Sequence, residues 1–373
     1  MIERFLEEKM KAKLGRGKAL VLMGARQTGK TTLIRSLVEG REGTLWLNGD
    51  ENDVRALFEN ISATRLKAIL GQNSTLILDE AQRIRDIGLK LKLLTDQLPH
   101  IQLIATGSSS FDLANQVNEP LTGRKWEYIL FPLSFGEMAA HHSLLEEKRL
   151  LPHRLVYGYY PDVIGHPGEE KEILQQLSDS YLYKDVLAWE RIKKSEKLVK
   201  LLQALAFQVG NQVSYPELGQ MCGLDYKTTE KYILLLEQAY VVFRLGSFSR
   251  NLRNELKASR KIYFIDNGIR NAVVADFRPL ELRNDAGALW ENFMIVERMK
   301  KLRYREIRAN CWFWRTQRQQ EIDYLEEADG RISACEFKWN PSANFKQPRS
   351  FIEAYPKSSF SAIHRENFEE FLL

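Results

Sequence analysis

An eight-residue segment near the start of the chain, GARQTGKT at residues 24–31, constrains the fold more than any other feature. It fits the pattern G-x-x-x-x-G-K-[ST], with an apolar run (19–23) before it and an amphipathic helical pattern after it. In that context the two glycines let the backbone curl closely enough for its N–H groups to face a phosphate at the helix start. The segment therefore predicts a phosphate-binding loop (P-loop) between a buried strand and a helix.

Strands and helices alternate over residues 19–130, with helical patterns after Lys30, around 51–70 and around 85–98. The five expected strands are ALVLM (19–23), TLWLN (44–48), TLILD (75–79), IQLIAT (101–106) and WEYIL (126–130). All five are short and apolar, as in a parallel sheet with both faces covered. The fold class expected here is α/β, a P-loop NTPase with a parallel five-stranded sheet.

The loop predicts ATP with Mg²⁺ as its ligand. Lys30 should reach the β- and γ-phosphates, Thr31 should hold Mg²⁺, and Thr32 should lie near the α-phosphate. The expected nucleotide-binding residues are Gly24, Ala25, Arg26, Gln27, Thr28, Gly29, Lys30, Thr31 and Thr32.

The segment TLILDE (75–80), an apolar run that ends in two acids, supplies the second half of the expected site. Asp79 should bind the Mg²⁺ shell through water, so the metal-binding residues are Thr31 and Asp79. Glu80 should orient or activate the attacking water, and the alternative is that it is an ordinary surface carboxylate. ATP hydrolysis is the activity that this pair of motifs predicts.

Three further residues are candidates for sensing or stabilising the γ-phosphate. Ser108 follows the fourth expected strand, with Thr106 as a second choice, and the alternative is that Ser108 caps the next helix. Arg124 is a candidate arginine finger, acting within the chain or across an interface, although arginines are common before strands. The oligomeric state stays open, and a homo-oligomer is compatible with Arg124.

Residues 132–195 read as a helical linker that begins with a capping box, Ser134 and Glu137. Residues 196–260 read as a winged helix-turn-helix: a helix over 196–209, a second after Ser214, and a third over 225–240. The third helix should bury Leu234 and expose Lys227 and Lys231 near its start. Such a helix enters the DNA major groove in many helix-turn-helix proteins, but winged helices also serve in protein contacts.

Residues 261–373 contain a helix over 285–302 and a hairpin that places Asp323 on one strand, and Glu336 with Lys338 on the other. Glu336 and Lys338 share a face because side chains alternate along a strand. Two carboxylates can hold Mg²⁺, a lysine can orient a water, and Glu291 on the helix would be a third carboxylate. The set resembles the PD-(D/E)xK nuclease-like fold of restriction endonucleases, and the alternative is a strand with exposed charges.

Several segments together resemble a large group of bacterial and archaeal AAA-type ATPases that carry a C-terminal domain of unknown function. The matching segments are GARQTGKTTL, LILDEAQ, ATGSSS, LTGR…PLSFGE, GYYPDV, YLYKDV (181–186), KIYFIDNGIR, GALWENF (287–293), WFWRTQRQQEIDYL and CEFKW. The resemblance covers nearly the whole chain. It implies an ATPase domain and does not specify one cellular activity.

Composition narrows the remaining choices. The 373 residues, 44% hydrophobic, suit two or more packed domains, and no apolar run approaches the roughly 20 residues that span a bilayer. Three scattered cysteines and a charged N-terminus indicate a cytoplasmic protein without disulfides or a zinc site. The net charge is +5, and residues 181–261 hold 14 Lys or Arg against 8 Asp or Glu. This basic segment suggests an anionic partner.

The expected domains are residues 1–131, the P-loop ATPase core; 132–195, the helical linker; 196–260, the winged helix; and 261–373, the nuclease-like domain. Two functions remain open. The first is a Mg²⁺-dependent ATPase that acts on DNA and carries a metal-dependent nuclease centre. The second is a nucleotide-controlled switch or scaffold in which the nuclease-like domain only binds.

Overall fold

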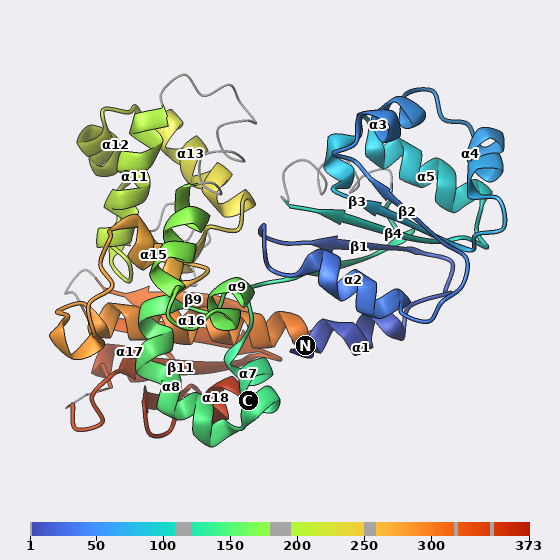
Figure 1. Ribbon diagram of the computed structural model, residues 1–373. Helices are drawn as coiled ribbons and strands as arrows, with labels where there is room; N and C mark the ends of the chain where they lie inside the picture. Colours follow the sequence, from blue (N-terminus) through green and yellow to red (C-terminus); the bar gives the residue numbers. More distant parts are fainter. Residues whose placement is uncertain (1, 109–120, 180–194, 250–258, 317–319, 344–346) are drawn as a thin grey trace. The chain divides into compact units, whose positions relative to one another are not determined.

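The computed structural model describes residues 2–108, 121–179, 195–249, 259–316, 320–343 and 347–373 (Figure 1). The chain forms two compact units. The first consists of Met1–Leu133 with Gln238–Tyr240, and the second of Ser134–Glu237 with Val241–Leu373. The four-domain division expected from the sequence stays a prediction.

The first unit is built on a five-stranded parallel sheet in the order β2-β3-β4-β1-β5. The strands are β1 (Ala19–Met23), β2 (Thr44–Asn48), β3 (Thr75–Asp79), β4 (Gln102–Gly107) and β5 (Lys125–Ile129). The first three have the expected bounds, and the last two are each shifted by one residue. Every residue of β1, β3 and β4 is buried, as expected for strands covered on both faces.

Helices cover both faces of this sheet (Figure 1). They are α1 (Phe5–Lys11), α2 (Lys30–Val38), α3 (Asn52–Glu59), α4 (Ala63–Leu70), the short η1 (Ala81–Arg83) and α5 (Ile87–Gln97). Helices α1 and α2 lie on one side of the sheet, and α3, α4 and α5 lie on the other. The pattern expected around 51–70 proves to be two helices. The second begins because the Ser62 hydroxyl accepts the Arg65 N–H and caps it.

The second unit opens with helices α7 (Phe135–His142), α8 (Leu144–Tyr157) and α9 (Pro161–Gly165), and residues 170–179 are also helical. The expected capping box at Ser134 and Glu137 starts α7. The segment YLYKDV lies outside the described residues.

Three helices and three strands follow. They are α11 (Ser195–Phe207), β6 (Gln212–Val213), α12 (Tyr215–Cys222), α13 (Tyr226–Gln238), β7 (Val242–Ser247) and β8 (Arg260–Phe264). Helix α12 starts after Ser214, as expected, and Gly223 ends it with a φ of 65°. The expectation that Leu234 is buried is wrong: it is 39% exposed, and the neighbouring Leu235 faces the core at 2%.

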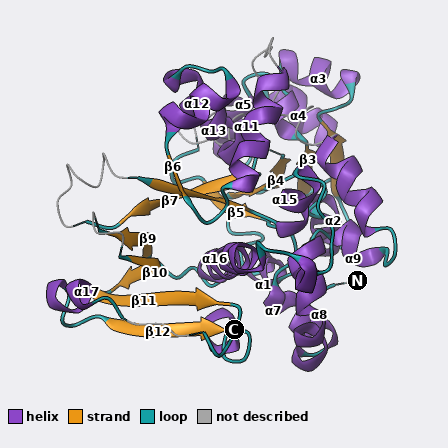
Figure 2. Ribbon diagram, turned by 90° about the vertical axis from the view of Figure 1, so that its left-hand side faces the viewer, coloured by secondary structure: helices purple, strands orange, loops and turns teal. Residues whose placement is uncertain are grey.

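A seven-stranded mixed sheet, ordered β12-β11-β10-β9-β7-β8-β6, forms the body of the second unit (Figure 2). Its C-terminal strands are β9 (Asn310–Arg315), β10 (Glu321–Ala328), β11 (Arg331–Lys338) and β12 (Ser359–His364). Strands β10 and β11 form the expected hairpin, and Asp329 and Gly330 at its turn both have positive φ. The sheet continues across residues 260 and 261, where the sequence suggested a domain boundary.

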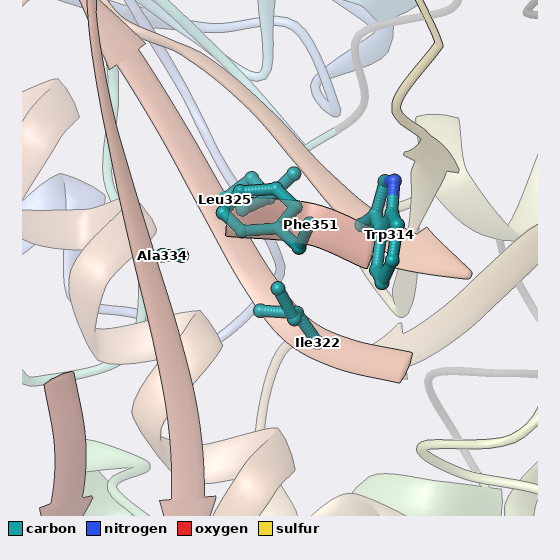
Figure 3. Close-up of a cluster of buried hydrophobic side chains, with 5 residues drawn as sticks. All are labelled: Trp314, Ile322, Leu325, Ala334 and Phe351. Atoms are coloured by element: carbon teal, nitrogen blue, oxygen red, sulfur yellow. The ribbon is translucent and has the colours of Figure 1, made fainter. Parts of the chain in front are cut away.

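The long helix α16 (Ala286–Tyr304) packs on this sheet against β8 and β11 (Figure 2). The short helix α17 (Arg349–Ala354) contributes Phe351 to a cluster with Trp314, Ile322, Leu325 and Ala334 (Figure 3). The Phe351 and Trp314 rings pack edge to face, with 5.2 Å between their centroids. The remaining short elements are η3 (Leu280–Leu282) and α18 (Glu369–Leu372).

Helix α15 (Asn267–Val273) is polar in sequence and yet buried. Its Asn271 amide donates to the carbonyls of Leu155 and Val156 at the end of α8, at 3.2 and 2.8 Å. A Cβ on Gly268 would clash with the Tyr157 carbonyl, so the two backbones approach closely. The polar side chains of α15 therefore hold it against the end of α8 through satisfied hydrogen bonds.

Candidate nucleotide-binding site

The loop at residues 24–29 connects the carboxyl end of β1 to the first turn of α2. A Cβ on Gly24 would clash with the Leu130 carbonyl, and the Leu130 N–H donates to the Met23 carbonyl at 2.7 Å. Gly29, with a φ of 92°, precedes the first residue of α2. Both glycines are therefore required by geometry, and the first-turn N–H groups of α2 lie beside the loop.

Lys30 is buried, at 6% exposure, and its ammonium contacts the loop itself. The Nζ donates to the carbonyl oxygens of Gly24 and Ala25 at 2.9 and 2.7 Å. These acceptors carry no formal charge, so a phosphate group would be a stronger partner for the ammonium.

Thr31 and Asp79 meet where α2 and β3 approach each other. The Thr31 hydroxyl donates to Asp79 Oδ2 at 3.0 Å, and the Thr106 hydroxyl donates to Asp79 Oδ1. A hydroxyl beside a carboxylate is an oxygen pair of the kind that Mg²⁺ uses in P-loop proteins, so the residues present fit this ion.

Glu80 follows β3 in a left-handed backbone conformation, with φ 49° and ψ 42°. Its N–H donates to the Thr106 hydroxyl at 3.1 Å. The Gln82 amide donates to Glu80 Oε2 at 2.6 Å and to the Ser108 hydroxyl at 3.1 Å. The structure thus brings Asp79, Glu80 and both sensor candidates together through Gln82 and Thr106.

Gln82 was not predicted, although it stands within LILDEAQ. The alternative role for Ser108, capping a following helix, involves residues 109–120, which lie outside the described part of the chain.

Arg4 is a second residue that sequence reasoning missed. Its guanidinium donates to the carbonyls of Thr28 and Phe131 at 2.8 and 2.7 Å, and it is 7% exposed. The Thr28 hydroxyl donates to the Ala25 carbonyl at 2.9 Å, which also braces the loop. No pattern in the charged N-terminal segment distinguished Arg4 from its neighbours.

The remaining loop residues differ in exposure. Gln27 and Thr32 are exposed, and Arg26 and Thr31 are partly buried. Gln27 has a φ of 57°, so the loop backbone is left-handed there.

Arg124 directly precedes β5, so it lies at the amino-terminal ends of the strands, whereas the loop lies at their carboxyl-terminal ends. Its carbonyl accepts the N–H of Ala19, the first residue of β1, and its guanidinium contacts Asp96. The five residues of β5, at about 3.3 Å each, separate it from the loop edge by about 16 Å. The structure therefore corrects the idea that Arg124 acts as a finger on the nucleotide of its own chain. A role across an interface stays a prediction.

The second unit brings the expected nuclease residues together around a lysine. Lys261 on β8 is 1% exposed, and its ammonium lies 3.0 Å from Glu291 Oε1, 2.5 Å from Glu321 Oε1 and 3.9 Å from Asp323 Oδ1. The Lys338 Nζ donates to Glu336 Oε1 at 2.6 Å. We name Glu291, Glu321, Asp323 and Glu336 the carboxylate cluster.

Burial raises the pKa values of three acids in this cluster. It raises the pKa of Glu291 to about 7, with repulsion from Asp323 adding to the effect and Lys261 opposing it. Burial also raises the pKa values of Asp323 and Glu336. For Lys261 burial lowers the pKa, but Glu291, Asp323 and Glu321 outweigh it, and the pKa rises above its usual range.

Within the described residues, no group of three or more His, Cys, Asp or Glu is placed to hold a metal ion. Glu291 and Asp323 share Lys261 as a neighbour, and Glu336 contacts Lys338. Among the described helices, none has the length and apolar character needed to span a membrane.

The fold and the loop define a P-loop ATPase domain, and comparison with known proteins specifies its class. Residues 16–139 match the family model described as an AAA domain. Residues 148–285 and 286–368 match two domains of unknown function, DUF8612 and DUF4143. The chain therefore carries an AAA-type ATPase domain followed by two domains of unknown function, the second of which is C-terminal.

Relatives with matches over most of this chain come from bacteria and archaea. Uncharacterized proteins of Mycobacterium tuberculosis and Mycobacterium bovis are each 27% identical over 341 residues, which covers 88% of this chain and 72% of each relative. One of Methanocaldococcus jannaschii is 23% identical over 95% of this chain and 82% of its own. A Walker-type ATPase of Pyrococcus abyssi, at 14% identity and a TM-score of 0.52, shares the fold over 74% of this chain and 96% of its own.

Proposed function

We propose that this chain binds ATP with Mg²⁺, hydrolyses it, and works as a nucleotide-controlled switch. The observation that carries the proposal is the hydrogen-bonded series from Thr31 through Asp79 and Thr106 to Glu80, set beside the loop that holds Lys30. These are the groups that position a metal, a phosphate and a water in P-loop ATPases.

Each residue has a separate task in this proposal. The loop N–H groups and Lys30 bind the phosphates, and Lys30 leaves the carbonyls of Gly24 and Ala25 to do so. Thr31 and Asp79 would hold Mg²⁺, which neutralises phosphate charge when bound.

Glu80 orients the attacking water and accepts its proton. Gln82, bonded to both Glu80 and Ser108, fixes the carboxylate in place. Ser108 lies at the end of this connection, where it could respond to the γ-phosphate.

Two variants test the proposal by phosphate release and by binding of a fluorescent ATP analogue. Lys30→Ala should abolish binding. Glu80→Gln should bind normally and turn over roughly 10²–10⁴-fold more slowly, because only the proton acceptor is lost. Lys92→Ala, at an exposed position on α5, is the matched control and should behave as wild type. Wild-type turnover in Glu80→Gln would sink the role given to Glu80.

A second function, contact with DNA, is favoured by the order of elements in the second unit. The order α11, β6, α12, α13, β7 and β8, with β8 pairing to both β6 and β7, supports our inference that this segment is a winged helix. Lys227 and Lys231 are exposed near the start of α13. Asp225 accepts from the Thr228 N–H and hydroxyl at the start of this helix.

Mobility-shift titrations at two salt concentrations test DNA contact. The double variant Lys227→Ala, Lys231→Ala should weaken binding and reduce the salt slope by about 2, about one unit per phosphate contact. Lys92→Ala again serves as the control, since it removes one exposed positive charge from the other unit. An unchanged salt slope in the double variant would exclude α13 as the contact surface.

A further inference from the structure

The carboxylate cluster gathers four acid side chains from three elements around one buried ammonium. Glu291 comes from α16, Glu321 and Asp323 from β10, and Glu336 from β11. The register between β9 and β10 shifts between Ile322 and Leu325, the stretch of β10 that contains Asp323. Buried acids at this density require a counter-charge, because an uncompensated buried charge is very costly.

The oxygens that would bind a metal already accept hydrogen bonds. Glu291 Oε1 accepts from both Lys261 Nζ and the Tyr263 hydroxyl, at 3.0 and 2.6 Å. Asp323 Oδ2 accepts the Phe337 N–H at 2.8 Å. Both groups are therefore oriented by donors from the protein itself.

Lys261 provides the counter-charge from inside the fold. Its side chain is 1% exposed, and its ammonium also lies 5.5 Å from the centre of the Phe313 ring. The strand position fixes it, because β8 pairs with β7 on one side and β6 on the other. A divalent ion on the same oxygens would therefore sit beside a positive charge that has no route to solvent, and the repulsion would be strong.

We propose that Lys261 is a permanent internal cation that takes the place of the metal ion, so that the C-terminal unit folds without divalent metal and is not a metal-dependent nuclease. This deepens the proposal of a nucleotide-controlled switch, in which this unit only binds. The nuclease prediction rested on Glu291, Asp323, Glu336 and Lys338, and Lys261 on β8 adds a positive charge beside two of these acids.

Mn²⁺ titration by calorimetry, without nucleotide, tests the inference on the full chain. Lys261→Met should gain one Mn²⁺ ion that binds at least tenfold more tightly than any Mn²⁺ bound by wild type. Adding Asp323→Asn to Lys261→Met should remove the gained ion, which assigns it to the cluster. Lys261→Arg keeps the charge and should behave as wild type.

Opposite results would overturn the inference. Either a Mn²⁺ ion that wild type binds and Asp323→Asn loses, or no gain of Mn²⁺ in folded Lys261→Met, contradicts it. If Lys261→Met folds only when Mn²⁺ is added, the metal has replaced the lysine and the inference stands. If Lys261→Met folds neither with nor without Mn²⁺, the test becomes a comparison of wild type with Asp323→Asn. If both bind the same number of Mn²⁺ ions, the inference is supported. If Asp323→Asn binds one ion fewer, the inference is overturned.

The metal readout is separate from the ATPase. A failure of Lys30 or Glu80 variants to change turnover would remove the proposed ATPase mechanism and leave the Mn²⁺ result unaffected. Plasmid cleavage in Mn²⁺ by wild type, lost in Glu336→Ala, would overturn the inference directly.

Discussion

Lys30 and Lys261 are both buried, and the groups that accept from them differ in charge. Lys30 donates to two main-chain carbonyls of its own loop. Lys261 contacts Glu291 and Glu321 and lies close to Asp323. The first ammonium has neutral acceptors that an anionic ligand can replace, whereas the second is already neutralised by anions of the protein.

This difference separates a binding site from a structural charge. In the first unit the acid that would hold the metal, Asp79, accepts from two hydroxyls and contacts no lysine in the described structure. In the second unit the positive charge of Lys261 already offsets the negative charge of the acids beside it. A motif with a lysine near acids therefore indicates a ligand site only where the lysine is not already paired with them.

Replacing each lysine by methionine should give the largest contrast. Lys261→Met leaves buried acids without their cation and should destabilise the second unit by about 3–5 kcal/mol. Lys30→Met removes hydrogen bonds to carbonyls and should cost only about 1 kcal/mol. Differential scanning calorimetry of the full chain measures both, because the two units need not melt in one transition. Equal losses for the two variants would contradict the comparison.

A double variant sharpens the same result. Glu291→Gln removes one of the anions that Lys261 balances, so Lys261→Met with Glu291→Gln should be more stable than the sum of the two single changes predicts. Strict additivity would mean that the two side chains do not interact energetically, despite the 3.0 Å contact.

The first unit was predictable from sequence because its signals are local. Each strand is one apolar run, and the loop glycines and Asp79 stand at strand ends that a parallel sheet brings to one edge. Arg124 shows the limit of that reasoning. It precedes a strand in sequence, and so it belongs at the opposite edge from the loop.

The second unit was less predictable because its decisive contacts are long-range. Lys261 is 30 residues before Glu291 and 62 before Asp323 in the sequence, and only the pairing of β7, β8 and β9 brings them together. One signal was available: Lys261 and Tyr263 are two residues apart, so they share one face of their strand. Gln82 likewise became visible only through its hydrogen bonds to Glu80 and Ser108.

The pH dependence of stability tests how strongly Lys261 balances its acids. The folded-state pKa of Glu291 is raised from 4.5 to about 7, so the folded chain holds a proton that the unfolded chain releases over that interval. Its stability contribution is therefore present below pH 4.5 and is lost as pH rises towards 7. The change is at most about 3.5 kcal/mol, at about 1.4 kcal/mol per pKa unit. Asp323 and Glu336 act in the same direction.

Glu291→Gln removes this titration, so the second unit of the variant should lose less stability than wild type between pH 4.5 and 7. Calorimetry across that range measures the slope, with Glu353→Gln, at an exposed position on α17, as the control. Lys261 cannot imitate the effect, because its raised pKa places its loss of charge at alkaline pH. A slope equal to that of wild type would show that Glu291 stays ionised throughout. The attraction of Lys261 for the Glu291 carboxylate would then offset the effect of burial on the pKa of Glu291.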